Sequence, residues 1–453
     1  MSRYTAVTET DLKEMLAEIG VASLDELFDA QVPAGVRLGR ELDLPPGLPE
    51  QDVYAHLREL AARNVSVEDE LSFLGAGMYD HYVPSLIDML MERSEFLTPY
   101  TPYQPEISQG GLQVMFEYQT AICELTALPV SNASVYEGPS AVAAAGYLAK
   151  LANGRPRFVV SAGLHPHARE TLRTMAHGYG AELVEVPLRD GVTDPDAWAG
   201  AIDERTGAVF FQNPNFYGAV EDAEALAGAA KESGAVVIGS YDAITLGVLK
   251  PPGECGVDVA VGEGQPLGNR LDFGGPSFGW FAATEAYQRR MPGRIAGETR
   301  DVDGRRGFVL TLQTREQHIR REKATSNICT AQALNALGGV AYLTWLGRAG
   351  IVELGELLLA RTAYARDALC ALDGVEALHT QPVIREFAVR LDAPVARVLA
   401  RCREQGVNPG LPLDDDGLLV AITERRTRAD IDRLAETVGA AVAAEREAVG
   451  ARA

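Results

Sequence analysis

The sequence predicts an α/β protein with a mainly parallel sheet, because short apolar runs alternate with helical patterns through the middle of the chain. Each run is rich in Val, Phe, Ile or Ala and is bounded by Gly, Pro, Asp or Asn. Strands separated by helices in this way form crossover units, and crossover units build parallel sheets. The predicted strands are residues 157–162, 181–187, 207–212, 235–240, 257–261 and 279–283.

The N-terminal region, residues 1–65, is predicted to be a helical segment of its own. Ser23 and Glu26 have the spacing of a helix capping box, in which a hydroxyl and a carboxylate satisfy the first backbone N–H groups. The stretch 31–50 carries four prolines, which end any helix that reaches them. We therefore expect short helices joined by a linker that contains Pro33, Pro45, Pro46 and Pro49.

The rest of the chain is predicted to form a large α/β domain, residues 66–335, and a small α+β domain, residues 336–453. A long helix beyond Gly338 leads into the small domain, and its apolar runs predict an antiparallel sheet. A last amphipathic helix is expected from Thr427 onward. The runs that predict this second sheet are residues 380–391, 406–412 and 417–423.

Charge and cysteine content narrow the class of protein. The chain has 453 residues with 41 Lys+Arg and 63 Asp+Glu, a formal charge of −22. A surface this acidic repels phosphate backbones and anionic lipid, so nucleic acid and membranes are poor partners. The five cysteines form no CxxC pair, and the sequence contains neither a signal peptide nor an apolar run of about 18 residues. We therefore expect a reduced, soluble, cytoplasmic protein.

Two features fit a pyridoxal phosphate site. Asp242 follows a predicted strand, at the sheet edge where α/β proteins bind ligands. Ser140 belongs to a Gly-Pro-Ser sequence that opens a predicted helix, and a hydroxyl with free backbone N–H groups at a helix start suits a phosphate. A phosphate cup, then a strand-end aspartate, then a lysine is the layout of the aminotransferase-like fold, in which the lysine forms a Schiff base with the cofactor.

The lysine of that layout is missing. It is expected just after the strand 257–261, but residues 262–268 contain no lysine. Ser140 and Asp242 therefore indicate a degenerate cofactor site with no covalent cofactor on this chain. A self-sufficient pyridoxal phosphate enzyme remains an alternative only if Lys250 or Lys323 acts from an unexpected place.

Two polar segments are further candidates for a binding site. In 96–110, three prolines fix an extended loop that can present side chains outward. In 305–330, a cationic cluster contrasts with the acidic chain and could bind a carboxylate or an acidic partner; a solvated helix face with ion pairs is the alternative. His165 and His167 lack further ligands, so no metal is predicted. The candidates are Tyr100, Thr101, Tyr103, Gln104, Glu106, Ser108 and Gln109 in the loop, and Arg315, Arg320 and Lys323 in the cluster.

Several segments carry a resemblance to a known family. They are residues 73–77, 79–84, 100–110, 116–120, 132–134 and 306–330. They resemble the P-protein of the glycine cleavage system, glycine dehydrogenase (decarboxylating), and more narrowly its N-terminal half, which is a separate subunit 1 in many bacteria. The resemblance covers nearly the whole chain. The family often has Asp in place of Glu137 and Ala in place of Pro99, and neither departure touches the inference.

The resemblance implies a pyridoxal-phosphate-dependent, transferase-like fold of type I and a role in glycine decarboxylation. In this family the aminomethyl group of glycine passes to the lipoyl arm of H-protein, and subunit 2 carries the Schiff-base lysine. The chain would then be inactive alone and would assemble with two copies of each subunit. The loop candidates would line a shared cleft, while Arg315, Arg320 and Lys323 would hold the interface or the substrate carboxylate. A purely structural or regulatory partner of a pyridoxal phosphate enzyme is the alternative.

Overall fold

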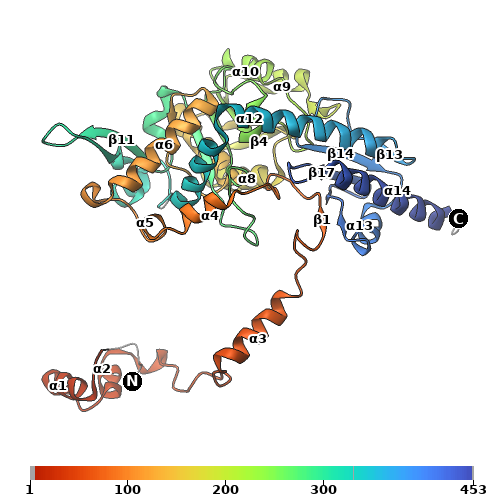
Figure 1. Ribbon diagram of the computed structural model, residues 1–453. Helices are drawn as coiled ribbons and strands as arrows, with labels where there is room; N and C mark the ends of the chain where they lie inside the picture. The colour runs from red at the N-terminus through yellow and green to blue at the C-terminus, as the bar shows by residue number, and fades with distance from the viewer. Residues whose placement is uncertain (1–5, 330, 451–453) are drawn as a thin grey trace. The chain divides into compact units, whose positions relative to one another are not determined.

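The computed structural model describes residues 6–329 and 331–450, shown as a ribbon in Figure 1. The chain divides into two compact units, one that extends to Val65 and one that begins at Ser66. Each unit is described by itself.

The N-terminal unit consists of short helices with little core of their own. Of its described residues only Leu16 is buried. Ser23 caps the second helix, accepting a hydrogen bond from the Glu26 N–H (3.1 Å), as predicted. The Glu26 carboxylate accepts from the N–H of Ala22 (2.7 Å) instead of Ser23, so the reciprocal contact is shifted by one residue. The helices are α1 (Glu9–Ile19), α2 (Leu24–Gln31), η1 (Ala34–Val36) and α3 (Glu50–Ala61).

A seven-stranded sheet forms the centre of the second unit, in the order β2-β10-β9-β8-β7-β3-β4. Strands β4, β3, β7, β8 and β9 are parallel, and β10 is antiparallel to both of its neighbours. The prediction of a mainly parallel sheet is confirmed. The strands are β2 (Val130–Ser131), β3 (Arg157–Ser161), β4 (Glu182–Val186), β7 (Thr206–Asn213), β8 (Val236–Tyr241), β9 (Val259–Glu263) and β10 (Gly279–Ala283).

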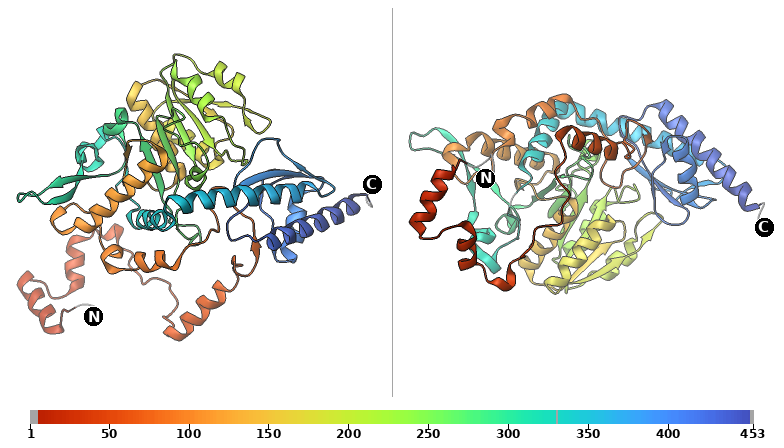
Figure 2. Two further views of the ribbon diagram at one scale, coloured as in Figure 1. Left: turned by 45° about the horizontal axis from the view of Figure 1, so that its top comes forward. Right: turned by 90° about the horizontal axis from the view of Figure 1, so that it is seen from below.

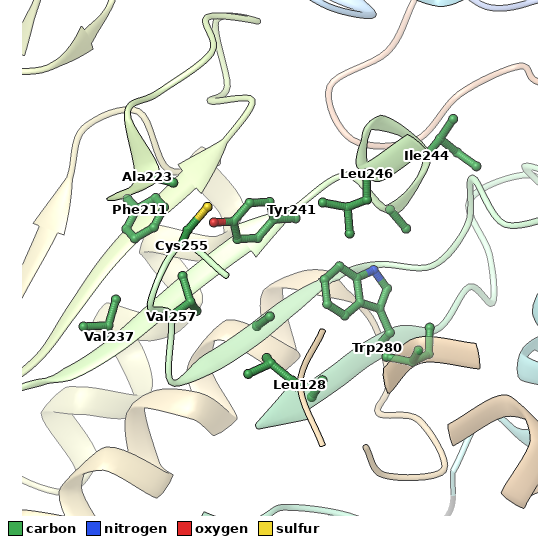
Figure 3. Close-up of a cluster of buried hydrophobic side chains, with 14 of the residues drawn as sticks. Leu128, Phe211, Ala223, Val237, Tyr241, Ile244, Leu246, Cys255, Val257 and Trp280 are labelled. Atoms are coloured by element: carbon green, nitrogen blue, oxygen red, sulfur yellow. The ribbon is translucent and has the colours of Figure 1, made fainter. Parts of the chain in front are cut away.

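Apolar side chains on both faces of this sheet are covered by helices. Because successive residues of a strand point to opposite faces, Phe158 and Val159 of β3 enter different clusters. Helices α7 (Gly138–Asn153) and α8 (Pro166–Gly178) pack on the Phe158 face. Figure 3 shows part of the other cluster, where Cys255 lies close to Tyr241. The helices that contribute to this second cluster include α6 (Gln109–Thr126), α9 (Pro195–Ala201), α10 (Ala223–Lys231) and α12.

The long helix α12 (Ala333–Cys370) leads from the central sheet to a second, antiparallel sheet, as Figures 1 and 2 show. Gly347 interrupts it with a φ of 61°, a conformation that glycine adopts at little cost. The second sheet has the order β13-β14-β17-β16 and packs with α13 and α14 around its own apolar cluster. Its elements are β13 (Val375–Ala377), β14 (Glu386–Leu391), α13 (Val395–Glu404), β16 (Leu411–Pro412), β17 (Gly417–Ala421) and α14 (Arg428–Gly450).

The cationic segment, residues 305–330, does not form the solvated helix face that was the alternative interpretation. Its first part forms β12 (Arg306–Thr311), which pairs in an antiparallel hairpin with the preceding strand β11 (Ile295–Arg300), and the only α-helix among its described residues is α11 (Gln317–Arg320). Thr330 lies outside the described residues. The remaining elements are β1 (Leu71–Ser72), which pairs with β15 (Val407–Asn408), α4 (Ser85–Met91), α5 (Ser94–Leu97), η2 (Pro105–Ile107), β5 (Leu188–Arg189), β6 (Val192–Thr193), η3 (Ala243–Gly247), η4 (Glu285–Arg290), η5 (Gln313–Arg315) and η6 (Arg321–Lys323).

Within residues 6–329 and 331–450, no helix combines the length and the apolar character that a membrane crossing requires.

Candidate functional site

A cavity of about 750 Å³ lies where strands β8 and β9 end and helix α7 begins. This is the edge at which open α/β sheets bind their ligands. The seven-stranded and the four-stranded sheet both contribute to its walls. Leu411 and Pro412 of β16 line it together with Asp242 and Glu263, which lie at the ends of β8 and β9. Further lining comes from Gly75–Tyr79, Glu137–Pro139 and His165.

The start of α7, predicted as a phosphate cup, is occupied by two carboxylates of the chain itself. Glu137 is the N-cap residue, and it accepts hydrogen bonds from the N–H (3.0 Å) and the hydroxyl of Ser140. Glu263, at the end of β9, accepts from the N–H groups of Gly138 (2.9 Å) and Gln265 (3.0 Å). Burial raises the pKa of Glu263, and the nearby charge of Glu137 raises it further.

Asp242, the predicted partner of a cofactor ring nitrogen, forms a buried ion pair with Arg385. The Arg385 Nη1 atom lies 2.8 Å and 3.1 Å from the two carboxylate oxygens. Only 2% of Arg385 is exposed, and its guanidinium carbon lies 3.9 Å from the ring centroid of Tyr79. Burial alone would lower the pKa of Arg385, but the charges of Asp242, Tyr79 and Glu424 together with the hydrogen bond to Asp242 raise it.

Glu386, next to Arg385, is held by the segment that enters the cavity from the other side. Its carboxylate accepts hydrogen bonds from the Tyr79 hydroxyl (2.7 Å) and from the Ala76 N–H (2.6 Å). Burial raises the pKa of Glu386 to about 7. This carboxyl group therefore changes its charge near neutral pH while it lies inside the protein.

Gln265 occupies the stretch where the layout calls for a lysine. Its side chain is fully buried, and its amide nitrogen donates to the carbonyl oxygens of Tyr79 (3.0 Å) and Asn269 (2.8 Å). Its amide oxygen accepts from the Tyr79 N–H (2.9 Å). Lys250 pairs with Glu224 on the surface, and no described lysine lines the cavity, which leaves the self-sufficient enzyme without structural support.

These residues do not fit a covalently held pyridoxal phosphate. Such a site needs an amine, free N–H groups for the phosphate and a free carboxylate for the ring nitrogen. Here residues 262–268 contain no lysine, and the start of α7 is filled by Glu137 and Glu263. The Asp242 carboxylate is already paired with Arg385.

His165 anchors a loop beside this cavity. Its Nε2 atom lies 2.9 Å from the carbonyl oxygen of Ala76 and donates to it, and its Nδ1 atom accepts from the N–H of His167 (3.1 Å). Both ring nitrogens are therefore engaged by the backbone, and burial lowers the pKa of His165.

The extended loop of the sequence analysis borders a second cavity of about 530 Å³. Tyr100, Thr101 and Ser108 line it, together with Arg294, of which only 4% is exposed. Tyr103 lies beside that arginine: its hydroxyl accepts from Arg294 Nη2 (3.2 Å), and its ring centroid is 5.5 Å from the guanidinium carbon.

The other loop candidates lie around this cavity without lining it. Gln109 ties the loop to β12, because its amide donates to the carbonyl oxygens of Pro105 (2.7 Å) and Phe308 (2.9 Å) and accepts from the Phe308 N–H (2.8 Å). Gln104 and Glu106 are exposed.

Arg315 differs from its two companions in the cationic cluster. It is buried, and its guanidinium donates to the carbonyl oxygens of Leu312 (3.1 Å), Gly293 (3.0 Å) and Met291. The geometry thus favours a positioning role, in which Arg315 fixes the loop that carries Arg294. Arg320 and Lys323 are exposed.

The sequence reasoning missed four residues at these sites: Glu137, Glu263, Arg294 and Arg385. Glu137 stands directly before the Gly-Pro-Ser sequence, and a carboxylate at a helix N-cap position is a recognisable signal. Arg385 lies 143 positions from Asp242, and no local pattern joins the two residues.

Comparison with known proteins identifies the family. Residues 2–438 match the model of the family described as glycine cleavage system P-protein. The chain belongs to this P-protein family. It is 48% identical to a protein of Geotalea uraniireducens (strain Rf4) named probable glycine dehydrogenase (decarboxylating) subunit 1, with 97% of this chain and 100% of that protein covered.

Solved structures agree with the assignment to the P-protein family. A crystal structure of glycine decarboxylase (P-protein) of the glycine cleavage system, in inhibitor-bound form, superposes with a TM-score of 0.90 at 43% identity and covers 97% of this chain and 100% of that one. Lactobacillus brevis glutamate decarboxylase shares only the fold, with a TM-score of 0.69 at 14% identity over 90% of this chain and 95% of that one. The predicted pyridoxal-phosphate-dependent fold of type I is confirmed.

The buried ion pair predicts a specific pattern of stability. Asp242→Asn leaves Arg385 buried without its counter-charge, so we expect a loss of about 3–5 kcal/mol in the free energy of unfolding. The double variant Asp242→Asn/Arg385→Met removes both charges and should recover at least about 1 kcal/mol of that loss. Denaturant unfolding measures both effects. Arg390→Met, on the strand β14 that follows Arg385, breaks only exposed pairs with Asp414 and Asp416 and should cost at most about 1 kcal/mol. Additive effects of the two substitutions would contradict the coupling.

Glu386 predicts a dependence of stability on pH. Its pKa is about 7 in the folded protein and 4.5 as the ordinary value, so between these values the folded state binds more protons than the unfolded state. The stability that Glu386 contributes must then fall as pH rises from about 5 to 7.5. Relative to the wild type, Glu386→Gln should gain on the order of 1–3 kcal/mol over that range.

Unfolding curves at several pH values measure this difference, and Glu376→Gln on the exposed side of β13 provides the baseline. Parallel pH profiles of Glu386→Gln and the wild type would show that Glu386 is already ionised in the folded protein at pH 5.

Proposed function

We propose that the chain is subunit 1 of a two-subunit glycine dehydrogenase (decarboxylating) and acts only together with a second subunit that carries the cofactor lysine. The observation that carries this proposal is the combination of a full-length match to proteins of that name with a buried glutamine where the lysine is expected. A cofactor lysine must then come from another chain. The reaction is the release of the glycine carboxyl group as CO2 and the transfer of the aminomethyl group to the lipoyl arm of H-protein.

Covalent pyridoxal phosphate is proposed on the second subunit, because this chain offers no amine in its own cavity. The cytoplasm is the proposed compartment, since five free cysteines without a CxxC pair suit a reducing environment. We propose an assembly with two copies of each subunit, as is usual for symmetric oligomers.

The second cavity is our candidate for this chain's part of a shared cleft. Tyr100 and Ile107 at its rim are 80% and 81% exposed, and such large exposed side chains on one loop suit a surface that a partner covers. Arg294 supplies a buried guanidinium in the wall, and its Nε atom lies 3.8 Å from the Glu316 carboxylate. Tyr100, Thr101, Tyr103, Gln104, Glu106, Ser108 and Gln109 would line the cleft or the path of the lipoyl arm, and Arg320 and Lys323 would lie at the interface.

A second candidate function is a structural or regulatory partner that contributes no residue to the active site. The first cavity favours this second function. Its Asp242 carboxylate is already paired with Arg385, and the N–H groups at the start of α7 are already bonded to Glu137 and Glu263. The two functions differ in what point variants of the loop should do, because only the shared cleft makes turnover sensitive to single side chains.

Exchange of the glycine carboxyl group with CO2 tests the assignment of subunit 1. With H-protein and pyridoxal phosphate present, the chain alone should give no exchange above background, because it has no lysine in the cavity. Addition of subunit 2 should give robust exchange. Exchange by the isolated chain would contradict the proposal and would direct attention to Lys250 and Lys323.

Truncation of one side chain of the loop tests the shared cleft. We expect Tyr100→Ala to lower kcat/KM of the assembled enzyme by about tenfold, which corresponds to about 1.4 kcal/mol, because it removes an exposed cleft side chain without disturbing the core. Met175→Ala, which truncates an exposed side chain on α8 away from the loop, should leave turnover unchanged. Gel filtration shows whether each variant still assembles. Full turnover of Tyr100→Ala in an intact complex would favour the structural partner.

A further inference from the structure

The start of α7 is an anion site that the protein has filled for itself. A helix N-terminus presents free N–H groups and a partial positive charge, so it attracts anions. Glu137 reaches it from the residue before the helix, and Glu263 reaches it from the end of β9. Two carboxylates from separate elements thus converge on the first turn of one 16-residue helix.

Gly138 permits this convergence. A Cβ atom at Gly138 would lie 3.1–3.3 Å from the backbone nitrogen, Cβ and Cα atoms of Glu263, closer than packed side chains normally allow. With glycine there, the end of β9 approaches the helix closely enough for the Glu263 carboxylate to accept from the Gly138 N–H. The filling is therefore part of the backbone packing and not a chance rotamer of a surface side chain.

On the opposite side of the cavity, a positively charged side chain of the protein occupies a carboxylate in the same way. Asp242 stands where fold type I enzymes present a carboxylate to the ring nitrogen, and Arg385 supplies the positive charge instead. Arg385 has a φ of 70° and is stacked on Tyr79, so the segments around it hold the guanidinium in place.

We propose that these side chains replace the charged groups of the cofactor. The carboxylates of Glu137 and Glu263 take the place of its phosphate, and the guanidinium of Arg385 takes the place of its protonated ring nitrogen. The cavity then rejects phosphate-bearing ligands, because their negative charge would meet two carboxylates and no free N–H group. This proposal holds whatever reaction the assembled enzyme performs.

The proposal predicts that removal of the two carboxylates creates a phosphate site. The double variant Glu137→Ser/Glu263→Ser frees the N–H groups of the first turn, and serine is itself a favourable N-cap residue, so α7 should persist. We expect the full-length wild-type chain to bind neither inorganic phosphate nor pyridoxal phosphate in calorimetric titrations. The double variant should bind both, with at least about a tenfold gain in affinity, or about 1.4 kcal/mol.

A matched control separates this effect from the change in net charge. Glu204→Ser/Glu285→Ser removes two exposed carboxylates elsewhere and should give no gain. A third variant, Ser140→Glu in the background of the double variant, restores a carboxylate at the helix start and should abolish the gain.

Two results would overturn the proposal. One is binding of phosphate or pyridoxal phosphate by the wild type as tight as that of the double variant. The other is a folded double variant, judged by circular dichroism, that gains no affinity. Should the double variant fail to fold, the single variants Glu137→Ser and Glu263→Ser are titrated instead. Each should gain part of the affinity, and the absence of any gain in both would equally reject the proposal.

Discussion

The ion pair between Arg385 and Asp242 links the seven-stranded and the four-stranded sheet of the second unit. Asp242 ends a strand of the seven-stranded sheet, and Arg385 directly precedes β14 of the four-stranded sheet. Because the Arg385 charge is buried and the Asp242 side chain is only 14% exposed, loss of either partner leaves a poorly solvated charge. Their mutual position therefore dictates how closely the two sheets approach at the cavity, and the neighbouring contacts are arranged around this distance.

The segment Gly75–Tyr82 depends on that arrangement, since it lies between the two sheets and bonds to both. On one side, Gln265, two residues beyond β9 of the large sheet, holds the backbone of Tyr79. On the other, Glu386 accepts from Tyr79 and Ala76, Asp80 pairs with Arg425 and Arg426, and Glu424 accepts from the N–H of Tyr82. The contacts of Ala76, Tyr79, Asp80 and Tyr82 on this second side fix the segment to the small sheet.

The sequence was informative where local patterns decide the structure. All six runs proposed for the central sheet are strands, since buried parallel strands show as continuous apolar runs. Two-residue β2 is too short to leave a pattern, and the hairpin β11–β12 lies in a segment whose charges suggested a helix. At the site, Asp242, Ser140 and the missing lysine could be identified because they lie in short motifs. Arg385 and Glu263 could not, because their roles arise from tertiary contacts between residues far apart in sequence.

The filled cavity also bears on how this chain can change through mutation. Recovery of a cofactor site would need a lysine near Gln265, removal of the carboxylates of Glu137 and Glu263, and release of Asp242 from Arg385. Replacement of Asp242 alone leaves the buried charge of Arg385 without its partner. Replacement of Gln265 alone removes the hydrogen bonds that hold the backbone of Tyr79. These two first steps thus lower stability before any catalytic gain exists. Under the proposed division of labour with a second subunit, the lack of a cofactor lysine in this chain is therefore difficult to reverse by single substitutions.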